Sequence, residues 1–213
     1  MMSIADLRRE YASRALDEAS ASADPLAQFS TWFAEAEASD LLDVNAMTLA
    51  TVTPAGDPAA RIVLLKDFGP EGFVFFTNYE SAKGHDLAAH PRACLLAYWA
   101  PLERQVRVTG AVERVSDEDS TAYFHSRPVE SQIGAWASQQ STPVEHRGVL
   151  EDRFRALQAQ YEGTTVPRPH YWGGYRVVPE RIEFWQGRPS RLHDRLLYER
   201  GASGEWSRTR LAP

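Results

Sequence analysis

The chain has 213 residues, of which 43% are hydrophobic and 24% charged, values typical of one globular domain. Its formal net charge of −6 argues against a general nucleic-acid binder, and no apolar run is long enough to form a membrane-spanning helix. The single cysteine, Cys94, excludes an internal disulfide framework and a multi-cysteine metal site, and it favours a reducing, cytoplasmic setting.

The predicted elements begin after a polar N-terminal segment. Residues 1–23 are rich in Ala and Ser and carry few large apolar groups, so we expect a short helix and a mobile arm. The domain itself is predicted over residues 24–213. Asp24-Pro25 begins a helix over residues 25–39, whose apolar side chains repeat at spacings of three and four.

Short segments rich in β-branched and aromatic residues follow, and Gly, Pro and Asp turns separate them. Five such segments at close spacing favour a β-barrel over a parallel βαβ sheet. A helix that ends before Pro91 interrupts them. The strands are predicted at residues 46–53, 59–66, 72–77, 93–100 and 104–115.

The second half of the chain begins with predicted helices and returns to strands. Ser116 opens a helix over residues 117–126, and acidic residues in its first turn favour that end of the helix dipole. Pro128 is predicted as the first residue of the next helix, and residues 147–161 form another. Strands are predicted at residues 181–186, 195–200 and 205–211. This order predicts one α+β, mainly β, domain around a barrel.

Common enzyme motifs do not occur in this sequence. It has no phosphate loop, no G-x-G-x-x-G after a strand, no G-x-S-x-G elbow and no H-E-x-x-H. The six histidines show no spacing typical of metal ligands, so we predict no metal site. Nucleotide-loop enzymes and zinc hydrolases are therefore disfavoured.

Basic residues beside the predicted strand ends are the first candidates for binding. All but two of the 23 basic residues are arginines, and the exceptions are Lys66 and Lys83. Arg61 and Lys66 bracket one predicted strand and lie on opposite faces by simple alternation. Lys83 lies near the start of a helix, where backbone N–H groups also favour an anion. A surface salt bridge is the alternative for each of them.

A second group of candidates follows the predicted helix at residues 117–126. Tyr123 and Arg127 are four residues apart and share a helical face if the helix continues that far, and Ser131 lies one turn further. A phenol, a guanidinium and a hydroxyl aimed the same way suit a phosphate or a carboxylate. A solvated face with Tyr123 packed on the core is the alternative.

Two further segments suit a flat ring with a polar rim. Gln140 and Ser141 offer hydrogen-bond donors and acceptors, although a polar helix end is the alternative. Near the C-terminus an aromatic platform precedes cationic groups that alternate along an extended segment and repel one another unless an anion lies among them. That segment contains Trp185, Arg191, His193 and Arg195. A planar, anionic cofactor fits both segments, but the residues alone do not name it.

These candidates lie in segments that closely resemble the pyridoxamine 5′-phosphate oxidase family. The resemblance runs from about residue 24 to the C-terminus, with one further segment before it. The matching segments are RREY (8–11), RIVLLK (61–66), FFTN-x4-K (75–83), ERQVRV (103–108), YFHSRP (123–128), SQIGAW (131–136), SQQS (138–141), WGGYRV (172–177) and IEFWQG-x3-RLHDR-x2-Y (182–198).

The resemblance implies a homodimeric split β-barrel with peripheral helices that binds FMN at the subunit interface. It implies oxidation of pyridoxamine or pyridoxine 5′-phosphate to pyridoxal 5′-phosphate, with O2 reduced to H2O2. The implied FMN ligands are Arg61, Ile62, Val63, Leu64, Lys66, Phe76, Thr77, Lys83, Gln105, Gln140, Ser141, Trp185 and Arg195. The implied substrate contacts are Lys66, Tyr123, Arg127, Ser131, Arg191 and His193, with Arg8 and Tyr11 as contacts from an N-terminal lid.

Arg195 and His193 are the expected catalytic residues at the reacting end of the substrate. Ala82 departs from the family pattern, because many relatives carry a basic residue there, so one phosphate contact to FMN is expected to be missing. A non-enzymatic carrier of flavin or pyridoxal phosphate and a deazaflavin-dependent split-barrel reductase remain alternatives. The RLHDR and YFHSRP segments argue against the reductase.

Overall fold

The computed structural model describes residues 14–213, so the predicted lid contacts Arg8 and Tyr11 lie outside the described residues. The helices in the described part are α1 (Pro25–Glu37), α2 (Ala82–Ala89), α3 (Asp117–Ser126), α4 (Val129–Ala137) and α5 (Arg147–Gln160). The strands there are β1 (Ala46–Val52), β2 (Pro58–Leu64), β3 (Asp67–Gly69), β4 (Gly72–Asn78), β5 (Arg92–Trp99), β6 (Arg104–Arg114), β7 (Trp172–Gln186), β8 (Asp194–Arg200) and β9 (Trp206–Arg210). None of the described helices has the length and apolar character needed to cross a membrane.

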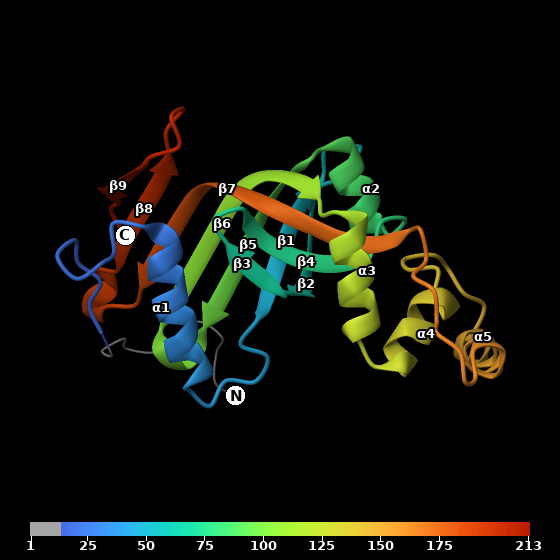
Figure 1. Cartoon of the computed structure of the whole chain (residues 1–213). Coiled ribbons are helices and arrows are strands. Elements are labelled where there is room, and N and C mark those ends of the chain that lie inside the picture. The colour runs from blue at the N-terminus through green and yellow to red at the C-terminus, as the bar shows by residue number, and fades with distance from the viewer. Residues whose placement is uncertain (1–13) are drawn as a thin grey trace, which may run out of the picture.

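The strands form one antiparallel sheet in the order β2-β1-β5-β6-β7-β4-β3. The long strand β7 organises it, because β6 pairs along one of its edges while β4 and β8 share the other (Figure 1). β4 pairs with residues 172–177 and β8 with residues 181–186, and β9 extends the sheet beyond β8. The strand positions predicted from the sequence are confirmed to within a few residues, except that β7 begins at Trp172, well before the predicted start at residue 181.

The sheet is curved but is not a closed barrel in the part of the chain that the structure describes. β2 and β3 lie at its two ends, and just past β2 the backbone N–H of Lys66 donates to Val74 O at 2.8 Å. This bond joins the segment after β2 to β4 without a continuous ladder of pairs. The predicted mainly β fold with peripheral helices is thereby confirmed, and the barrel is split.

The main core lies between α1 and the inner face of the sheet. Asp24 accepts a hydrogen bond from Leu26 N at 3.0 Å, and Pro25 occupies the first turn, so the helix begins where the sequence predicts. Phe29 and Trp32 are buried, and their rings meet Phe73 and Phe184 edge-on. Each buried aromatic contributes roughly 1.5–3 kcal/mol, so this contact holds α1 against the sheet.

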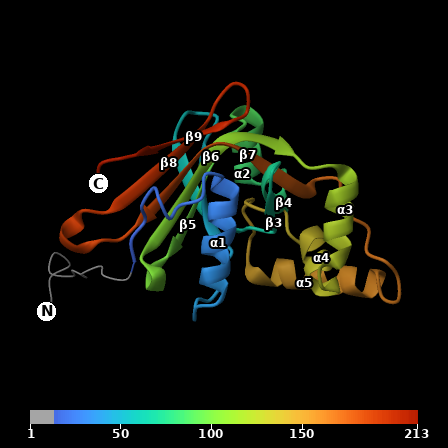
Figure 2. The same ribbon diagram turned by 60° about the vertical axis from the view of Figure 1, so that its left-hand side comes forward.

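α3, α4 and α5 gather at one end of the sheet, and β8, β9 and the C-terminus lie at the other (Figures 1 and 2). A smaller core of Phe124, Ile133, Val166 and Trp172 supports the helical end. α3 starts where predicted, since Ser116 Oγ accepts from Asp119 N at 2.9 Å. The helical end is therefore built around β7, which supplies Trp172.

The predicted end of α3 is confirmed at the α3–α4 junction, but the condition for a face shared by Tyr123 and Arg127 is not met and the prediction for Pro128 is wrong. α3 ends at Ser126, so Arg127 does not continue the helical face of Tyr123 but is extended, with φ −79° and ψ 152°. Pro128 is the N-cap of α4 rather than its first helical residue. The ring of Pro128 disfavours the helical conformation of Arg127, the residue before it, and so ends α3 there.

The described part of the predicted N-terminal arm is packed against the domain. Leu16 is buried, and its N–H donates to Asp194 Oδ2 at 3.1 Å. From β9, Arg208 donates to Ala21 O at 2.9 Å and Arg210 donates to Leu16 O at 3.1 Å. Residues 14–22 are therefore fastened to β8 and β9 by arginines, which the composition of the arm did not indicate. The division at residue 24 stays a prediction.

Candidate functional site

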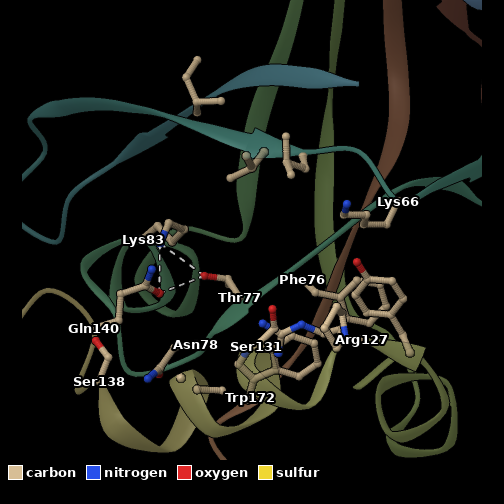
Figure 3. A pocket seen from close by; sticks show the side chains of 17 residues that line it. Lys66, Phe76, Thr77, Asn78, Lys83, Arg127, Ser131, Ser138, Gln140 and Trp172 are labelled. Atoms are coloured by element: carbon tan, nitrogen blue, oxygen red, sulfur yellow. Dashed lines mark hydrogen bonds between the residues drawn. The ribbon is translucent and has the colours of Figure 1, made fainter. Parts of the chain in front are cut away.

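A cavity of about 670 Å³ opens between β2, the C-terminal end of β4 and the helices α3 and α4. This volume lies within the range of about 300–1,000 Å³ that small-molecule sites occupy. Figure 3 shows Lys83, Thr77 and Gln140 on one side of the cavity and Lys66 and Arg127 on the other. The lining residues are Ile62, Val63, Leu64, Lys66, Phe76, Thr77, Asn78, Lys83, Tyr123, Arg127, Pro128, Ser131, Gly134, Ala135, Ser138, Gln140 and Trp172.

Lys83 occupies one side of the cavity at the start of α2. Gly84 permits this placement, because a Cβ there would lie 1.9 Å from Tyr79 O, so α2 packs directly on the chain that leaves β4. The Lys83 ammonium is buried and donates to Thr77 Oγ1 at 3.2 Å and to Gln140 Oε1 at 3.3 Å (Figure 3). Burial lowers the pKa of Lys83, the Arg61 guanidinium lowers it further, and Asp86 opposes the shift.

Arg127 occupies the opposite side. Its guanidinium lies 4.6 Å above the ring of Trp172, and its Nη1 is buried without a hydrogen-bond partner among the described residues. Burial lowers the pKa of Arg127, an effect that the nearby Tyr123 opposes. A buried guanidinium N–H left without an acceptor is costly. An anionic ligand in the cavity would supply that acceptor.

Aromatic rings form the wall beside Arg127. The rings of Phe76 and Tyr123 stack with their centroids 3.9 Å apart, and Phe76 also stacks with Trp172 at 5.6 Å. Phe76 pairs across the sheet with Gly174, which lacks a side chain and leaves room for the stacked rings. The stack fixes Tyr123 and Trp172 around Arg127, so the cationic group is held by packing rather than by a carboxylate.

The charge of the cavity is opposite in sign to that of the whole chain. Lys66, Lys83 and Arg127 line it, and none of the lining residues, all of which belong to the described part, is acidic. The whole chain carries a formal net charge of −6. Like charges gathered without counter-charges repel one another, and an anion stabilises them. The cavity therefore has cationic groups on two sides and suits an anion.

A second cluster of predicted site residues lies across three strands at the other end of the sheet. Gln105 of β6 pairs with Trp185 of β7, and Trp185 pairs with Arg195 of β8, so the three share one face. The ring of His193 lies 4.6 Å from that of Trp185. The three strands thus bring together an amide, a flat ring and a guanidinium, although Gln105 and Arg195 are 90 residues apart in sequence.

The loop before β8 favours one tautomer of the neutral His193 ring. Arg188 N–H donates to His193 Nδ1 at 3.1 Å, so the neutral ring carries its proton on Nε2. Ser190 and Arg191 in the same loop have positive φ values of 55° and 61°. Side chains rarely adopt this conformation, and residues held in it cluster at functional sites. In this tautomer the donor of the ring is Nε2.

The structure divides the predicted site residues into two groups. One group lines the cavity, as the sequence predicted, and consists of Ile62, Val63, Leu64, Lys66, Phe76, Thr77, Lys83, Tyr123, Arg127, Ser131 and Gln140. The other group does not line it and consists of Arg61, Gln105, Ser141, Trp185, Arg191, His193 and Arg195. Arg61 is not among the lining residues and pairs with Asp86 at 3.1 Å. Its face is opposite to that of Ile62, as alternation along the strand requires.

Sequence reasoning did not single out several residues that complete these groups. Trp172 stacks under Arg127, and Asn78 and Ser138 also line the cavity. The buried carboxylate of Glu183 pairs with Arg195. Trp172 and Glu183 both lie in segments quoted for the family resemblance. An aromatic residue or a carboxylate in a segment that also contains arginines was the signal that could have identified them.

Comparisons with known proteins assign both halves of the chain to the same kind of protein. Residues 33–161 match a family model described as pyridoxamine 5′-phosphate oxidase. Residues 172–213 match one described as the pyridoxine 5′-phosphate oxidase C-terminal dimerisation region, which fits a homodimer.

Relatives of similar length share more than half of their residues with this chain. A pyridoxine/pyridoxamine 5′-phosphate oxidase of Ralstonia pickettii is 59% identical, and one of Gloeothece citriformis is 57% identical, with 99% or more of each chain covered. A structure of PhzG from Burkholderia lata in complex with tetrahydrophenazine-1-carboxylic acid is 29% identical with a TM-score of 0.87, covering 93% of this chain and 98% of that one. A related FMN-binding protein of Nostoc punctiforme shares the fold, at 20% identity and a TM-score of 0.70 over 89% of this chain and 98% of that one.

The open, curved antiparallel sheet, the cavity lined by cations at its rim and these relatives together define an oxidoreductase. The chain belongs to the pyridoxamine 5′-phosphate oxidase family.

Proposed function

We propose that this protein oxidises pyridoxamine 5′-phosphate and pyridoxine 5′-phosphate to pyridoxal 5′-phosphate with FMN as cofactor, and that O2 is reduced to H2O2. The observation that carries the proposal is the cavity lined by Lys66, Lys83 and Arg127, with no acidic residue among its lining residues and a buried Arg127 Nη1 that lacks an acceptor in the described chain. Two phosphate groups, one of cofactor and one of substrate, match its two cationic sides.

The side of the cavity around Lys83 suits the phosphate of FMN. The buried ammonium lies among Thr77, Ser81 and Gln140, all of which have side-chain oxygens within 3.3 Å of it. Burial disfavours the charged form of Lys83 in the free protein, and a bound phosphate would stabilise that form. Arg61, Ile62, Val63, Leu64, Phe76 and Ser141 would complete the FMN contacts that the family resemblance implies. When bound, FMN supplies the two-electron acceptor that passes electrons to O2.

A second copy of the chain would complete this site. Ile62 and Leu64 line the cavity and are 62% and 41% exposed, and Tyr98, which pairs with Gln105, is 53% exposed. These residues form an open apolar face between the cavity and the Gln105–Trp185–Arg195 row. A two-fold dimer through that face would bring the row of one copy to the cavity of the other. FMN would then lie at the subunit interface.

The side of the cavity around Arg127 suits the substrate phosphate. Arg127, Lys66, Tyr123 and Ser131 offer two cations and two hydroxyl groups that would fix this phosphate. The phosphate is remote from the carbon that is oxidised, so these contacts set the orientation of the substrate. Arg191 of the second copy would add a further cation beside the substrate.

Arg195 and His193 would act at the reacting end. Arg195 is expected to orient the amine or hydroxyl of the substrate. It would also stabilise the negative charge that the flavin gains as it is reduced. His193 Nδ1 accepts from Arg188 N–H, so Nε2 carries the proton of the neutral ring and donates. We therefore propose a hydrogen-bonding role for His193 rather than that of a general base at Nε2.

The purified protein tests the proposal directly. We expect a yellow protein with a flavin spectrum that pyridoxamine 5′-phosphate bleaches without oxygen and air restores, with one H2O2 formed per pyridoxal phosphate. Arg195→Leu should lower turnover far more than FMN content. A colourless protein that does not take up FMN would contradict the proposal. Bound flavin that the substrate does not bleach would instead favour a non-enzymatic carrier.

The relationship to PhzG names a second substrate class to include in that assay. A carboxylate on a reduced tricyclic ring offers the cavity an anion and a flat body, as a substrate phosphate ester does. Turnover of such a compound in preference to pyridoxamine 5′-phosphate would move the assignment to phenazine chemistry. The cytoplasmic setting expected from the single cysteine stays a prediction.

A further inference from the structure

Glu183 is a buried carboxylate in the middle of β7, on the face that carries the Gln105–Trp185–Arg195 row. It is 3% exposed and lies two residues before Trp185, so both side chains point to the same face. Its Oε1 accepts from Arg195 Nε at 2.8 Å, and its Oε2 pairs with Arg107 of β6. Glu183 therefore joins two arginines from the strands on either side of β7.

These contacts fix the plane of the Arg195 guanidinium. Nε is bonded to Glu183, and Nη1 donates to Ala212 O at 2.8 Å in the segment after β9. Nη2 has no hydrogen bond within residues 14–213. A guanidinium held through Nε and Nη1 has little freedom to rotate, because its five N–H groups lie in one rigid plane. The fixed contacts therefore leave Nη2 as the group available to a ligand.

We propose that Glu183 is a positioning residue that orients Arg195, so that Nη2 meets the flavin and the reacting end of the substrate. The proposal rests on the proposed function of Arg195. A buried carboxylate costs free energy unless it is paired, and two guanidinium partners compensate Glu183. The arrangement leaves the pair of arginines with one net positive charge beside the proposed flavin site.

A double-mutant cycle tests this role in the dimeric holoenzyme. The variants are Glu183→Gln, Arg195→Leu and the two combined, with FMN dissociation followed by flavin fluorescence and turnover followed separately. Glu183→Gln keeps the shape of the side chain and removes its charge. We expect it to weaken FMN binding and to lower turnover by about tenfold each, a coupling within the range for residues in direct contact. In the Arg195→Leu background the same substitution should change either quantity by less than about twofold.

Three variants serve as controls. Glu180→Gln removes a carboxylate from the same strand, where it pairs with Arg92 at the surface, and it should leave both quantities unchanged. Arg107→Gln removes the other partner of Glu183 and keeps the bond to Arg195 Nε, so its effect should also be small. Glu183→Asp retains the charge but shortens the reach, and its effect should lie between those of wild type and Glu183→Gln.

The outcomes separate this proposal from the proposed function. If Arg195→Leu alters neither FMN binding nor turnover, the role of Arg195 fails and the positioning role with it. If Arg195→Leu has its expected effect but Glu183→Gln has none, only the positioning role is overturned. An effect of Glu183→Gln that persists undiminished without Arg195, or that Arg107→Gln reproduces, would show that Glu183 acts through the stability of the sheet. If Glu183→Gln does not fold, Glu183→Asp in the two backgrounds decides by the same criterion.

Discussion

Arginines at the two ends of this sheet differ in the partners that surround them. At the helical end Arg127 lies on Trp172 with a buried N–H that lacks an acceptor among the described residues, and burial lowers its pKa. At the other end Arg210 pairs with Glu18 and Asp194, and the bond to Glu18 is the main cause that raises its pKa. An arginine thus stabilises the fold where carboxylates surround it, as at Arg210. Where they do not, as at Arg127, it suits an anionic ligand.

This difference means that the cations of the cavity and the arginines of β8 and β9 contribute differently to stability. Lys66, Lys83 and Arg127 remain together although they repel one another, because the aromatic stack and the sheet hold them. The arginines of β8 and β9 instead stabilise the docking of residues 14–22. Substitutions in the cavity should therefore lower activity more than stability, and substitutions in β8 and β9 should lower stability more than activity.

The largest effect is expected from Arg127→Met. The variant removes the cation that lies over Trp172, so kcat/KM for pyridoxamine 5′-phosphate should fall about 100- to 1,000-fold, mainly through KM. Because the guanidinium lacks a carboxylate partner, the melting temperature of the FMN-free protein should not fall. Steady-state kinetics and calorimetry measure the two quantities. The exposed Arg153→Met is the matched control on α5, and equal losses in both variants would contradict the role of Arg127.

A somewhat smaller effect is expected where the two regions meet in the proposed dimer. Ile62→Asp places a charge on the open apolar face, and we expect the dimer to dissociate about 100-fold more readily, with loss of FMN. Analytical ultracentrifugation across a dilution series measures the dissociation. Leu42→Asp is the control, since Leu42 is also exposed but lies outside the strands. A dimer that keeps its affinity in Ile62→Asp would place the interface elsewhere.

Arg210→Met should destabilise the fold by about 1–2 kcal/mol, the sum expected for partly exposed ion pairs and a hydrogen bond to Leu16 O. Since Arg210 lies away from the cavity, FMN binding should persist in the folded protein. Urea unfolding of the FMN-free protein measures the change. An unchanged free energy of unfolding would mean that residues 14–22 dock without this arginine.

The smallest effect concerns the pH dependence of FMN binding. Burial lowers the pKa of Lys83 in the free protein, whereas a bound phosphate favours the charged ammonium and raises it. Affinity should therefore be greatest below the pKa of the free protein and fall as the pH rises through it, by at most about tenfold per pH unit. Fluorescence titrations between about pH 7 and pH 10 measure this. Lys83→Met should bind FMN more weakly and without the alkaline fall, and an equal fall in both proteins would assign it to another group.

The sequence by itself determined the elements and the chemistry of the candidate residues. Asp24-Pro25 and Ser116 begin helices as predicted, because a capping side chain and its helix are neighbours in the chain. Alternation placed Arg61 and Lys66 on opposite faces of the predicted strand for the same local reason, and Lys66 lines the cavity while Arg61 pairs with Asp86. The family was visible because its segments are continuous runs of residues.

Only the tertiary structure decided which of these residues meet. Lys83 and Gln140 are 57 residues apart and become partners because α2 packs on Tyr79 and the segment after α4 reaches Thr77 of β4. Gln105, Trp185 and Arg195 align through strand register, which separates them from the cavity within one chain. The packing of Leu16 under Arg210 likewise depends on β9 reaching the arm. Local patterns fix backbone conformation, whereas the partners of a charged side chain follow from pairing across long stretches of sequence.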